Sequence, residues 1–317
     1  SRRQRVCING EWSQDIELEF GVPQGSVLGP LLFLISINDL PCNVKTKTFL
    51  YADDTSFISI SNSINDLKNT VHSVMADASV WFETNGFYLN QNKTQNIMFT
   101  LRPFDPTDSN LITVNDVKFL GVVIDNQLTW SSHIDHIVPK LSRVIYLLRR
   151  LKSLVTLDYL RVVYFAYFQS VIKYGLLFWG NSGRLSEILI LQKKAIRIIA
   201  NAERLDHCKP IFKELKITTI VNLYIFDLVV YAINKSFDWL FNEDVHAHNT
   251  RNKNNLSFVH CRLSKTLKSH TVLSKKVYNK LSHLIKMYNT QIFKNKLVVW
   301  LLKNPFYSLS EFFTVQN

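Results

Sequence analysis

The stretch FLYADDTSF at residues 49–57 restricts how this chain can fold more than any other. Strand-forming residues on both sides are interrupted by Asp53 and Asp54, which predicts a strand, a tight turn and a second strand. Two carboxylates 4 Å apart repel each other by about 4 kcal/mol at an effective dielectric constant of 20. A plain turn would use Asn-Gly or Asp-Gly at lower cost. An exposed acidic turn and a functional carboxylate pair both fit this stretch alone.

The residues before this stretch predict a hairpin, a loop and a helix. RVCINGEWSQDIELEF at residues 5–20 predicts a hairpin with Asn9-Gly10 at its turn. GVPQGSVLGP at residues 21–30 predicts a loop punctuated by glycines. The apolar run that follows it predicts a helix that ends near Pro41.

The residues after the stretch predict one helix and two strands. Apolar residues at spacings of three and four predict a helix that Asn85-Gly86 ends, with Ser63 and Asp66 as its capping box. FYLNQNKTQNIMFT predicts a loop and a strand, and VKFLGVVID predicts another strand before a turn at Asp125.

Beyond residue 130 the pattern becomes helical. Residues 131–153, 157–179 and 185–201 each predict a helix, and Pro139 predicts a kink in the first. A polar, asparagine-rich stretch, HAHNTRNKNN, breaks the pattern near residue 245. The predicted fold class is therefore α+β, with an α+β unit at residues 1–130, a helical unit at 131–245 and a small C-terminal region at 246–317.

The positive charge is concentrated near the C-terminus. The net charge is +12, yet residues 1–250 carry 25 basic and 24 acidic side chains. Arg251 to Lys303 contain twelve Lys or Arg and no Asp or Glu, interleaved with aromatic residues. This composition suits single-stranded nucleic acid, and it equally suits a solvated basic face on helices that bury the aromatics. The candidate nucleic-acid-binding residues are Arg251, Lys253, Arg262, Lys265, Lys268, Lys275 and Lys276.

Several other classes of protein are disfavoured. The first residues lack the apolar region of a signal peptide, and the cysteines form no CxxC pair, which indicates a reducing compartment. The most apolar stretch, residues 159–180, carries Arg161, Gln169 and Lys173, so a buried helix is favoured over a membrane span. His246, His248, His260 and Cys261 do not have the spacing of a structural zinc site.

Four motifs in a fixed order resemble a known family. GVPQGSVLGPLLF, FLYADD, LNQNKTQNIMF and FLGVVID resemble successive palm motifs of the reverse transcriptases of non-LTR retrotransposons, and most of all the jockey-type elements. HNTRN at 248–252 and WLLKNPFYSLSEFF at 300–313 resemble the C-terminal region of the same elements. The resemblance implies a partial polymerase palm at 1–130, a helical thumb at 131–245 and a basic C-terminal region at 246–317.

The resemblance also implies an activity and a set of site residues. The activity is RNA-directed DNA polymerisation with an RNA template, a DNA primer and deoxynucleoside triphosphates, on chromosomal DNA in the nucleus. Asp53 and Asp54 are then catalytic and bind two Mg²⁺ ions, for which Mn²⁺ can substitute. Gln24 and Gly25 match the loop along the nascent base pair, and Lys93 matches the lysine near the triphosphate. The primer grip corresponds to Phe119, Leu120 and Gly121. Without the family, these residues are equally turn glycines, a surface lysine and a buried strand.

The chain departs from the family pattern at its N-terminal end. The family's first palm motif, which carries a third metal-binding aspartate, and its fingers subdomain have no match here. Ser1 in place of an initiator Met suggests a C-terminal fragment. We therefore expect this chain alone not to polymerise DNA. The alternative is a degenerate or domesticated remnant that binds nucleic acid without catalysis. Insertion-site preference, template specificity and oligomeric state do not follow from the sequence.

Overall fold

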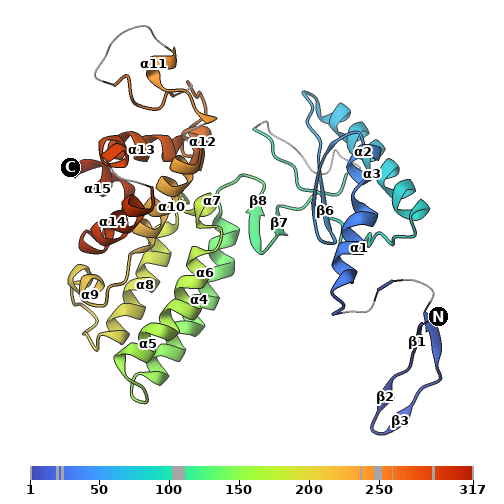
Figure 1. Cartoon of the computed structure of the whole chain (residues 1–317), viewed down its shortest axis with the longest axis horizontal. Coiled ribbons are helices and arrows are strands. Elements are labelled where there is room, and N and C mark those ends of the chain that lie inside the picture. The colour runs from blue at the N-terminus through green and yellow to red at the C-terminus, as the bar shows by residue number, and fades with distance from the viewer. Residues whose placement is uncertain are drawn as a thin grey trace. The chain divides into compact units, whose positions relative to one another are not determined.

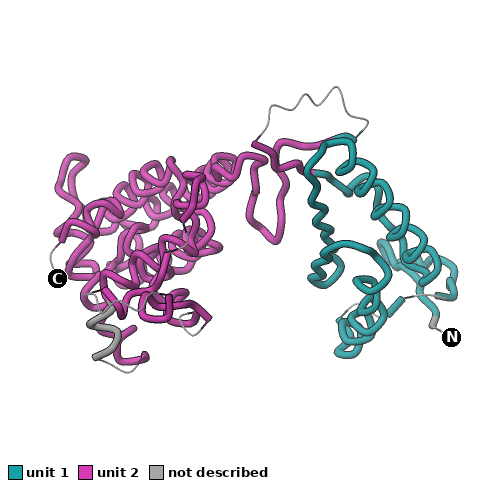
Figure 2. Tube along the Cα trace, turned by 90° about the horizontal axis from the view of Figure 1, so that it is seen from above, with its two compact units in different colours: residues 1–96, 106–112 teal, residues 97–105, 113–317 magenta. Residues whose placement is uncertain are grey.

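The chain folds into two compact units. The computed structural model describes residues 2–18, 21–22, 25–101, 111–235, 238–245, 252–258, 260–287 and 290–315. Unit 1 comprises residues 1–96 with 106–112, and unit 2 comprises 97–105 with 113–317 (Figure 2). Helices and two-stranded antiparallel sheets make up both, which agrees with the predicted α+β class. The expected functional borders at residues 130 and 245 stay predictions.

Unit 1 begins with the predicted hairpin (Figure 1). β1 (Arg2–Gln4) pairs with β4 (Ile16–Leu18), and β2 (Cys7–Ile8) pairs with β3 (Glu11–Trp12), both antiparallel. Asn9 and Gly10 close the turn with φ of 54° and 88°, the left-handed pair that a two-residue hairpin loop requires. The four side chains of β2 and β3 are exposed, so backbone hydrogen bonds rather than core packing hold this tip.

The rest of unit 1 packs helices against a second hairpin. Its elements are α1 (Leu28–Ile37), α2 (Leu40–Asn43), β5 (Lys47–Tyr51), β6 (Asp54–Ile58) and α3 (Ile64–Thr84). The predicted capping box begins α3, because the Ser63 hydroxyl accepts a hydrogen bond from the Asp66 N–H at 3.1 Å. The buried core consists of Ile37, Leu40, Val44, Val74, Ala78, Trp81 and Phe82.

Two predicted strands take other forms. Within FYLNQNKTQNIMFT only an isolated bridge forms, between Ile97 and Val114. Asn90 instead starts a turn, in which its Oδ1 accepts from the Lys93 N–H at 3.1 Å and its C=O from the Thr94 hydroxyl at 3.0 Å. Such local hydrogen bonds compete with a strand ladder.

VKFLGVVID forms a hairpin instead of one strand. β7 (Asp116–Phe119) pairs with β8 (Val122–Asp125), and Leu120 and Gly121 make the turn with φ of 46° and 84°. The continuous apolar run conceals this turn, because only Gly121 marks it in the sequence.

The helices of unit 2 follow the predicted segments closely. The first segment is α4 (Ser131–Leu151), and the third is α8 (Leu185–Ile199). The second is interrupted by a π-helical turn and divides into α5 (Leu157–Val163), η2 (Tyr164–Gln169), α6 (Ser170–Lys173) and α7 (Leu176–Trp179). The remaining helices are α9 (Cys208–Glu214), α10 (Ile220–Lys235), α11 (Asn242–Val245), α12 (Ser264–Leu267), α13 (His270–Met287), α14 (Thr290–Lys303) and α15 (Leu309–Thr314). None of the helices in the described ranges is both long and apolar enough to cross a membrane.

One core joins the C-terminal helices to the helices before them. Leu148 of α4 and Trp179 of α7 belong to the same buried cluster as Leu301 of α14 and Phe312 of α15. α10 lies in the middle and contacts α7, α8, α13 and α14 (Figure 1). The described part of the basic C-terminal region is therefore packed into unit 2.

Asn222 of α10 holds this arrangement in one register. Its fully buried amide donates to the carbonyls of Leu301 at 2.6 Å and Asn304 at 3.0 Å, and it accepts from the Phe306 N–H at 3.1 Å. Next to it, the Thr219 hydroxyl donates to the Phe306 carbonyl at 2.8 Å. These bonds satisfy backbone groups at the end of α14 that would otherwise be buried without partners.

Replacing this amide should weaken unit 2. We expect Asn222→Ala to lower the free energy of unfolding by about 2–4 kcal/mol, because it leaves buried backbone groups unsatisfied. Urea unfolding followed by circular dichroism measures the change, and Asn295→Ala on the exposed side of α14 is the control. Equal stability of the two variants would contradict this role for Asn222.

Candidate active site

The predicted strand, turn and strand around the two aspartates is confirmed. β5 and β6 pair in register from Lys47 with Ile58 to Tyr51 with Asp54, so Ala52 and Asp53 form the turn. Ala52 has φ of 49°, a left-handed conformation that alanine adopts only at a cost. The short turn thus contains Asp53, and Asp54 is the first residue of β6 directly after it.

The hairpin rests on the core of unit 1 through one face. Leu50 of β5 and Phe57 of β6 pack against the buried cluster of α1, α2 and α3. The Thr46 hydroxyl donates to the Ile58 carbonyl at 2.7 Å and ties the open end of the hairpin together. Alternation along β5 leaves Phe49 and Tyr51 exposed, so the packing positions the tip while the tip itself stays accessible.

The aspartate pair is exposed to solvent. Both Asp53 and Asp54 are in the exposed class, so water screens their repulsion more strongly than the sequence-based value of about 4 kcal/mol assumed. Within the described residues, no group of three or more His, Cys, Asp or Glu side chains gathers around a common point. The pair can therefore supply two oxygen ligands, and a complete cation cage needs a further ligand.

The other predicted residues of unit 1 lie in turns. Gly25 lies in an exposed turn before α1 with φ of 83°, and Lys93 lies in the exposed turn that Asn90 starts. Gln24 falls outside the described residues. The structure shows accessible positions for Gly25 and Lys93, and their roles stay predictions.

The predicted primer grip is the tip of the β7–β8 hairpin in unit 2. Phe119 ends β7 with 36% of its surface exposed, and the Tyr174 hydroxyl donates a hydrogen bond to the Leu120 carbonyl. A Cβ at Gly121 would lie 3.2 Å from Cε1 of Tyr174. The turn is thus packed closely against Tyr174, the residue that follows α6.

His133 of α4 is hydrogen-bonded to the backbone of β8 in this hairpin. Its buried ring accepts a hydrogen bond from the Val123 N–H at Nδ1, 3.3 Å away, and its centroid lies 5.3 Å from that of Trp179. Burial, together with the nearby charges of His136 and Lys140, lowers the pKa of His133 to about 4.

Asp125 has a structural role that the sequence reasoning missed. Its buried carboxylate accepts from the N–H groups of Gln127 at 3.2 Å, Thr129 at 2.8 Å and Trp130 at 2.5 Å. It therefore organises the turn that leads from β8 into α4. The Asp-Asn pair at 125–126 indicated a turn, and only the fold showed how many backbone groups depend on it.

Comparison with known proteins finds a similarity in the N-terminal part of the chain. Residues 4–124 match the family described as "Reverse transcriptase (RNA-dependent DNA polymerase)". These residues are therefore similar to that family. All residues of the β5–β6 and β7–β8 hairpins except Asp125 lie inside this matched segment.

Curated relatives extend the similarity into unit 2. The chain is 28% identical over 240 residues to "Probable RNA-directed DNA polymerase from transposon BS" of Drosophila melanogaster, covering 69% of this chain and 26% of that protein. It is 28% identical over 235 residues to "RNA-directed DNA polymerase from mobile element jockey" of the same species, covering 68% and 26%. The chain thus spans about a quarter of the length of these relatives. No solved structure matches the chain. The resemblance to jockey-type reverse transcriptases is confirmed.

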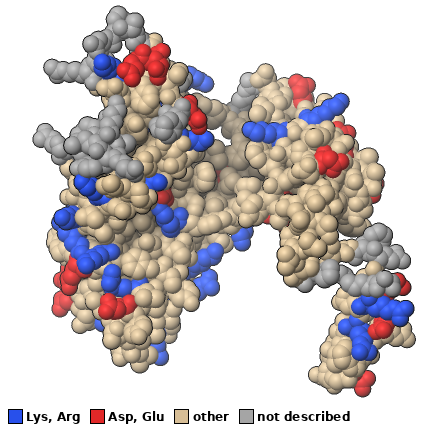
Figure 3. Space-filling model, viewed as in Figure 1, with Lys and Arg blue, Asp and Glu red and all other residues tan. Residues whose placement is uncertain are grey.

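The predicted nucleic-acid-binding residues beyond residue 124 fall into two groups. Lys253, Arg262, Lys265, Lys268 and Lys276 are exposed, whereas Arg251 lies outside the described residues. Lys275 is partly buried, donates to the Ser257 carbonyl at 3.0 Å and lies 5.0 Å from the centroid of the Trp239 ring. Within unit 2, the face in Figure 3 shows Lys and Arg spread over the helices rather than gathered in one patch.

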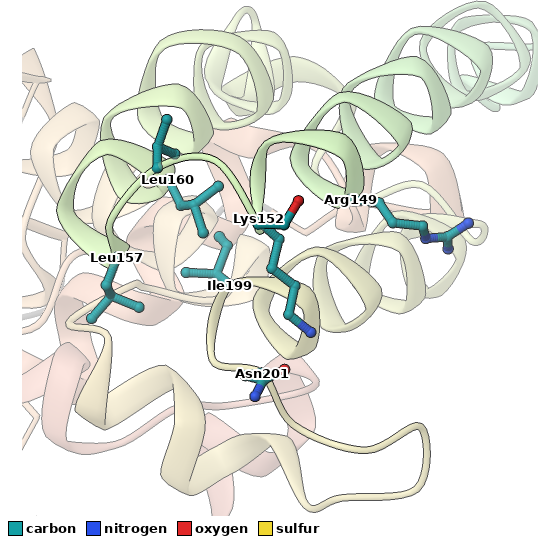
Figure 4. Close-up of a pocket in the computed structure, with 8 residues that line it drawn as sticks. Arg149, Lys152, Leu157, Leu160, Ile199 and Asn201 are labelled. Atoms are coloured by element: carbon teal, nitrogen blue, oxygen red, sulfur yellow. The ribbon is translucent and has the colours of Figure 1, made fainter.

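A further basic site lies where α4 ends. An open pocket of about 360 Å³ is lined by Arg149, Lys152, Ser153, Val155, Leu157, Leu160, Ile199 and Asn201. Lys152 and Asn201 end on one side of it, and Arg149 points away from Leu157 and Leu160 (Figure 4). No carboxylate lines the pocket, and the Lys152 ammonium that ends beside Asn201 suits an anionic group such as a phosphate.

The turn at Gly121 can be tested by adding a single methyl group. We expect Gly121→Ala to destabilise the chain by roughly 1–3 kcal/mol, because alanine is strained at φ of 84° and its Cβ would press on Tyr174. Thermal unfolding measures the loss. Gly183→Ala, whose Cβ would meet nothing within 4 Å, should leave stability within about 0.5 kcal/mol.

The neutral His133 ring should make stability depend on pH. The unfolded histidine has a pKa of about 6.5 and the folded one about 4, so the unfolded state binds the extra proton between these values. We expect stability to fall as pH drops from 6.5 to 4, by up to roughly 3 kcal/mol from this residue. Urea unfolding across that range should show a smaller slope for His133→Leu than for the exposed control His260→Gln. Identical slopes would refute the assignment.

Proposed function

We propose that this chain is part of an RNA-directed DNA polymerase, whose reaction transfers a nucleotide to a primer end. The observation that carries the proposal is the aspartate pair at the β5–β6 tip inside the segment that matches the reverse transcriptase family. The named activities of the BS and jockey relatives support it. Their names concern proteins about three times as long as this chain, so the activity of this chain is our inference.

The two carboxylates at the hairpin tip are suitable ligands for a divalent cation such as Mg²⁺, and they supply part of its ligand set. Mg²⁺ prefers oxygen ligands and commonly binds one or two carboxylates, with waters and substrate phosphates in its other positions. Asp53 and Asp54 would hold the ion, and their accessible tip leaves room for such ligands. When bound, a pair of such ions stabilises the attacking and leaving oxygens of a phosphoryl transfer. The residues of this chain would hold and orient those ions while the hairpin keeps its shape.

The remaining site residues take supporting roles in this proposal. Gln24 and Gly25 would lie along the template and the nascent base pair, and the Lys93 ammonium would neutralise the triphosphate. Phe119, Leu120 and Gly121 would position the primer end. The hydrogen bond from Tyr174 to Leu120 supports this role, because it fixes the turn from the helical unit.

The proposed subdomains follow from the same reasoning. Residues 1–130 would form a partial palm, residues 131–245 a thumb and residues 246–317 a nucleic-acid-binding region. The partners would be an RNA template, a DNA primer and deoxynucleoside triphosphates, with action in the nucleus. The exposed members of the basic set, such as Arg262 and Lys265, would contact the phosphate backbone. Lys275 is excluded from this group, because its amine already bonds the Ser257 carbonyl.

Cation binding at Asp53 and Asp54 tests the proposal on the chain as it is. Tyr51 is 65% exposed beside the turn, so a bound Tb³⁺ ion should show tyrosine-sensitised luminescence that Mg²⁺ displaces. We expect Asp53→Asn and Asp54→Asn each to weaken that signal at least tenfold, because each removes one of two anionic ligands. Asp77→Asn on the exposed side of α3 is the control. Equal signals from all three variants would overturn the proposal.

Primer extension on an RNA template tests the reaction itself. We expect no incorporation by this chain alone, because its described residues bring no third metal-binding side chain to the pair. Joining the upstream part of the jockey polymerase to this chain should supply that ligand. Asp53→Asn should then reduce Mg²⁺-dependent synthesis at least about a hundredfold. Incorporation by the chain alone would show that it provides the third ligand itself.

A further inference from the structure

An open pocket in unit 2 lies between α13, α15 and the segment before α12. It offers about 560 Å³ and is lined by Asn255, Phe258, Leu273, Lys276, Asn279, Leu309 and Phe313. This volume falls within the range of small-ligand sites. Three segments that are distant in the sequence thus build one concave surface, outside the segment that matches the reverse transcriptase family.

One wall of the pocket is the segment that carries Asn255 and Phe258, and hydrogen bonds from α13 fix its backbone. The Asn279 amide accepts from the Leu256 N–H at 2.7 Å and donates to the Leu256 carbonyl at 3.0 Å, as a neighbouring strand would. The Lys275 amine donates to the Ser257 carbonyl at 3.0 Å. These three bonds fix the backbone that presents Phe258, whose side chain is 47% exposed. In the described part of the chain, Phe258 has no aromatic partner.

The opposite wall is fixed by the same helix. The Lys280 amine donates to the carbonyls of Phe313 at 2.9 Å and Val315 at 2.6 Å, at the end of α15. The Ser308 hydroxyl caps α15 by accepting from the Glu311 N–H at 3.1 Å. Phe313, which is 36% exposed, therefore stands at the pocket as a second positioned ring.

The lysines around the pocket differ in whether their amines already have hydrogen-bond partners. Lys275 and Lys280 are engaged with backbone carbonyls, whereas Lys276 is exposed and has no ion-pair partner among the described residues. The sequence contains no Asp or Glu from Val245 to Ser310. The acidic residues on the neighbouring segments are Glu243 and Asp244 of α11, where the Glu243 N–H bonds the Lys253 carbonyl, and Glu311 of α15, which pairs with Lys209. A ligand with a flat apolar ring and an attached anion would match two rings and a free ammonium.

We propose that this pocket binds one unstacked base of a single-stranded nucleic acid, with Lys276 on an adjacent phosphate. The inference rests on the proposed function, because that function brings a single-stranded RNA template to this chain. It deepens that function by naming the two rings, Phe258 and Phe313, that take the base. An apolar peptide would use the rings and would leave the ammonium without a counter-charge.

Binding of a 12-nucleotide RNA without secondary structure tests the pocket in the full chain. Fluorescence anisotropy gives the dissociation constant for wild type, Phe258→Leu and Phe313→Leu, which keep an apolar side chain and lose the ring. We expect each to bind about tenfold more weakly, which is the usual effect of losing one stacking ring. Tyr159→Leu, an exposed ring on α5, is the matched control and should bind as wild type does. Lys276→Gln should weaken binding and lower its salt dependence more than Lys303→Gln does.

A series of RNAs, each with one abasic position, separates stacking from general attraction. We expect one position at which the missing base weakens binding to wild type and has no further effect on Phe258→Leu. RNA carrying 5-iodouridine at that position should crosslink to Phe258 or Phe313. Equal losses in wild type and variant at every position, or crosslinks confined to other residues, would overturn the proposal.

The proposed cation site and the proposed base-binding pocket can be tested independently of each other. Asp53→Asn removes the predicted cation site in unit 1 and should leave the RNA dissociation constant unchanged. Phe258→Leu should leave Tb³⁺ luminescence unchanged. Circular dichroism and thermal unfolding of each variant confirm that the fold is retained, which both partly exposed positions permit.

Discussion

The buried amide of Asn222 is the interaction on which the arrangement of the helical unit depends. A polar group in a core is stable only when all its hydrogen-bonding groups have partners, and Asn222 finds its partners at the end of α14. Only one register of α14 on α10 satisfies them. The helices that follow the asparagine-rich stretch are therefore part of the same folded body as α4 to α10. Deleting the basic region as a block would remove core residues such as Leu297 and Leu301. Its nucleic-acid contacts have to be studied one side chain at a time.

The aspartate hairpin differs from the Asn222 site, because its polar groups are exposed instead of buried. Its inner side chains anchor it on the core of unit 1, while the turn carries two exposed carboxylates and a left-handed alanine. Strain and repulsion are tolerated at the tip because the strand ladder and the packing of Leu50 and Phe57 hold the shape. A cation would lower the repulsion. The proposed cation binding therefore gives a reason for two adjacent aspartates at this turn, and it does not require that they be buried.

Local sequence patterns predicted those elements of this chain that depend on residues close together in the sequence. The Asn9-Gly10 turn, the Ser63 cap and the amphipathic stripe of α4 each depend on residues close in sequence, and all three were predictable. The hairpin at Leu120 was missed, because an apolar run hides a turn that only Gly121 marks. The strand expected near Ile97 was also wrong: the Asn90 side chain accepts from the Lys93 N–H and the Thr94 hydroxyl donates to the Asn90 carbonyl, which favours a turn. Tertiary contacts, which no local pattern contains, gave Asp125 and His133 their roles.

The sequence by itself determined the order of the polymerase motifs, the aspartate pair and the lack of acidic residues from Val245 to Ser310, because motif order and charge are properties of the chain. It could not distinguish one lysine from the next. Only the tertiary structure decided that Lys275 and Lys280 bond backbone carbonyls while Lys276 stays free beside two phenylalanine rings. The reason is geometric. The partners of these lysines come from segments up to 35 residues away, and folding alone brings them together.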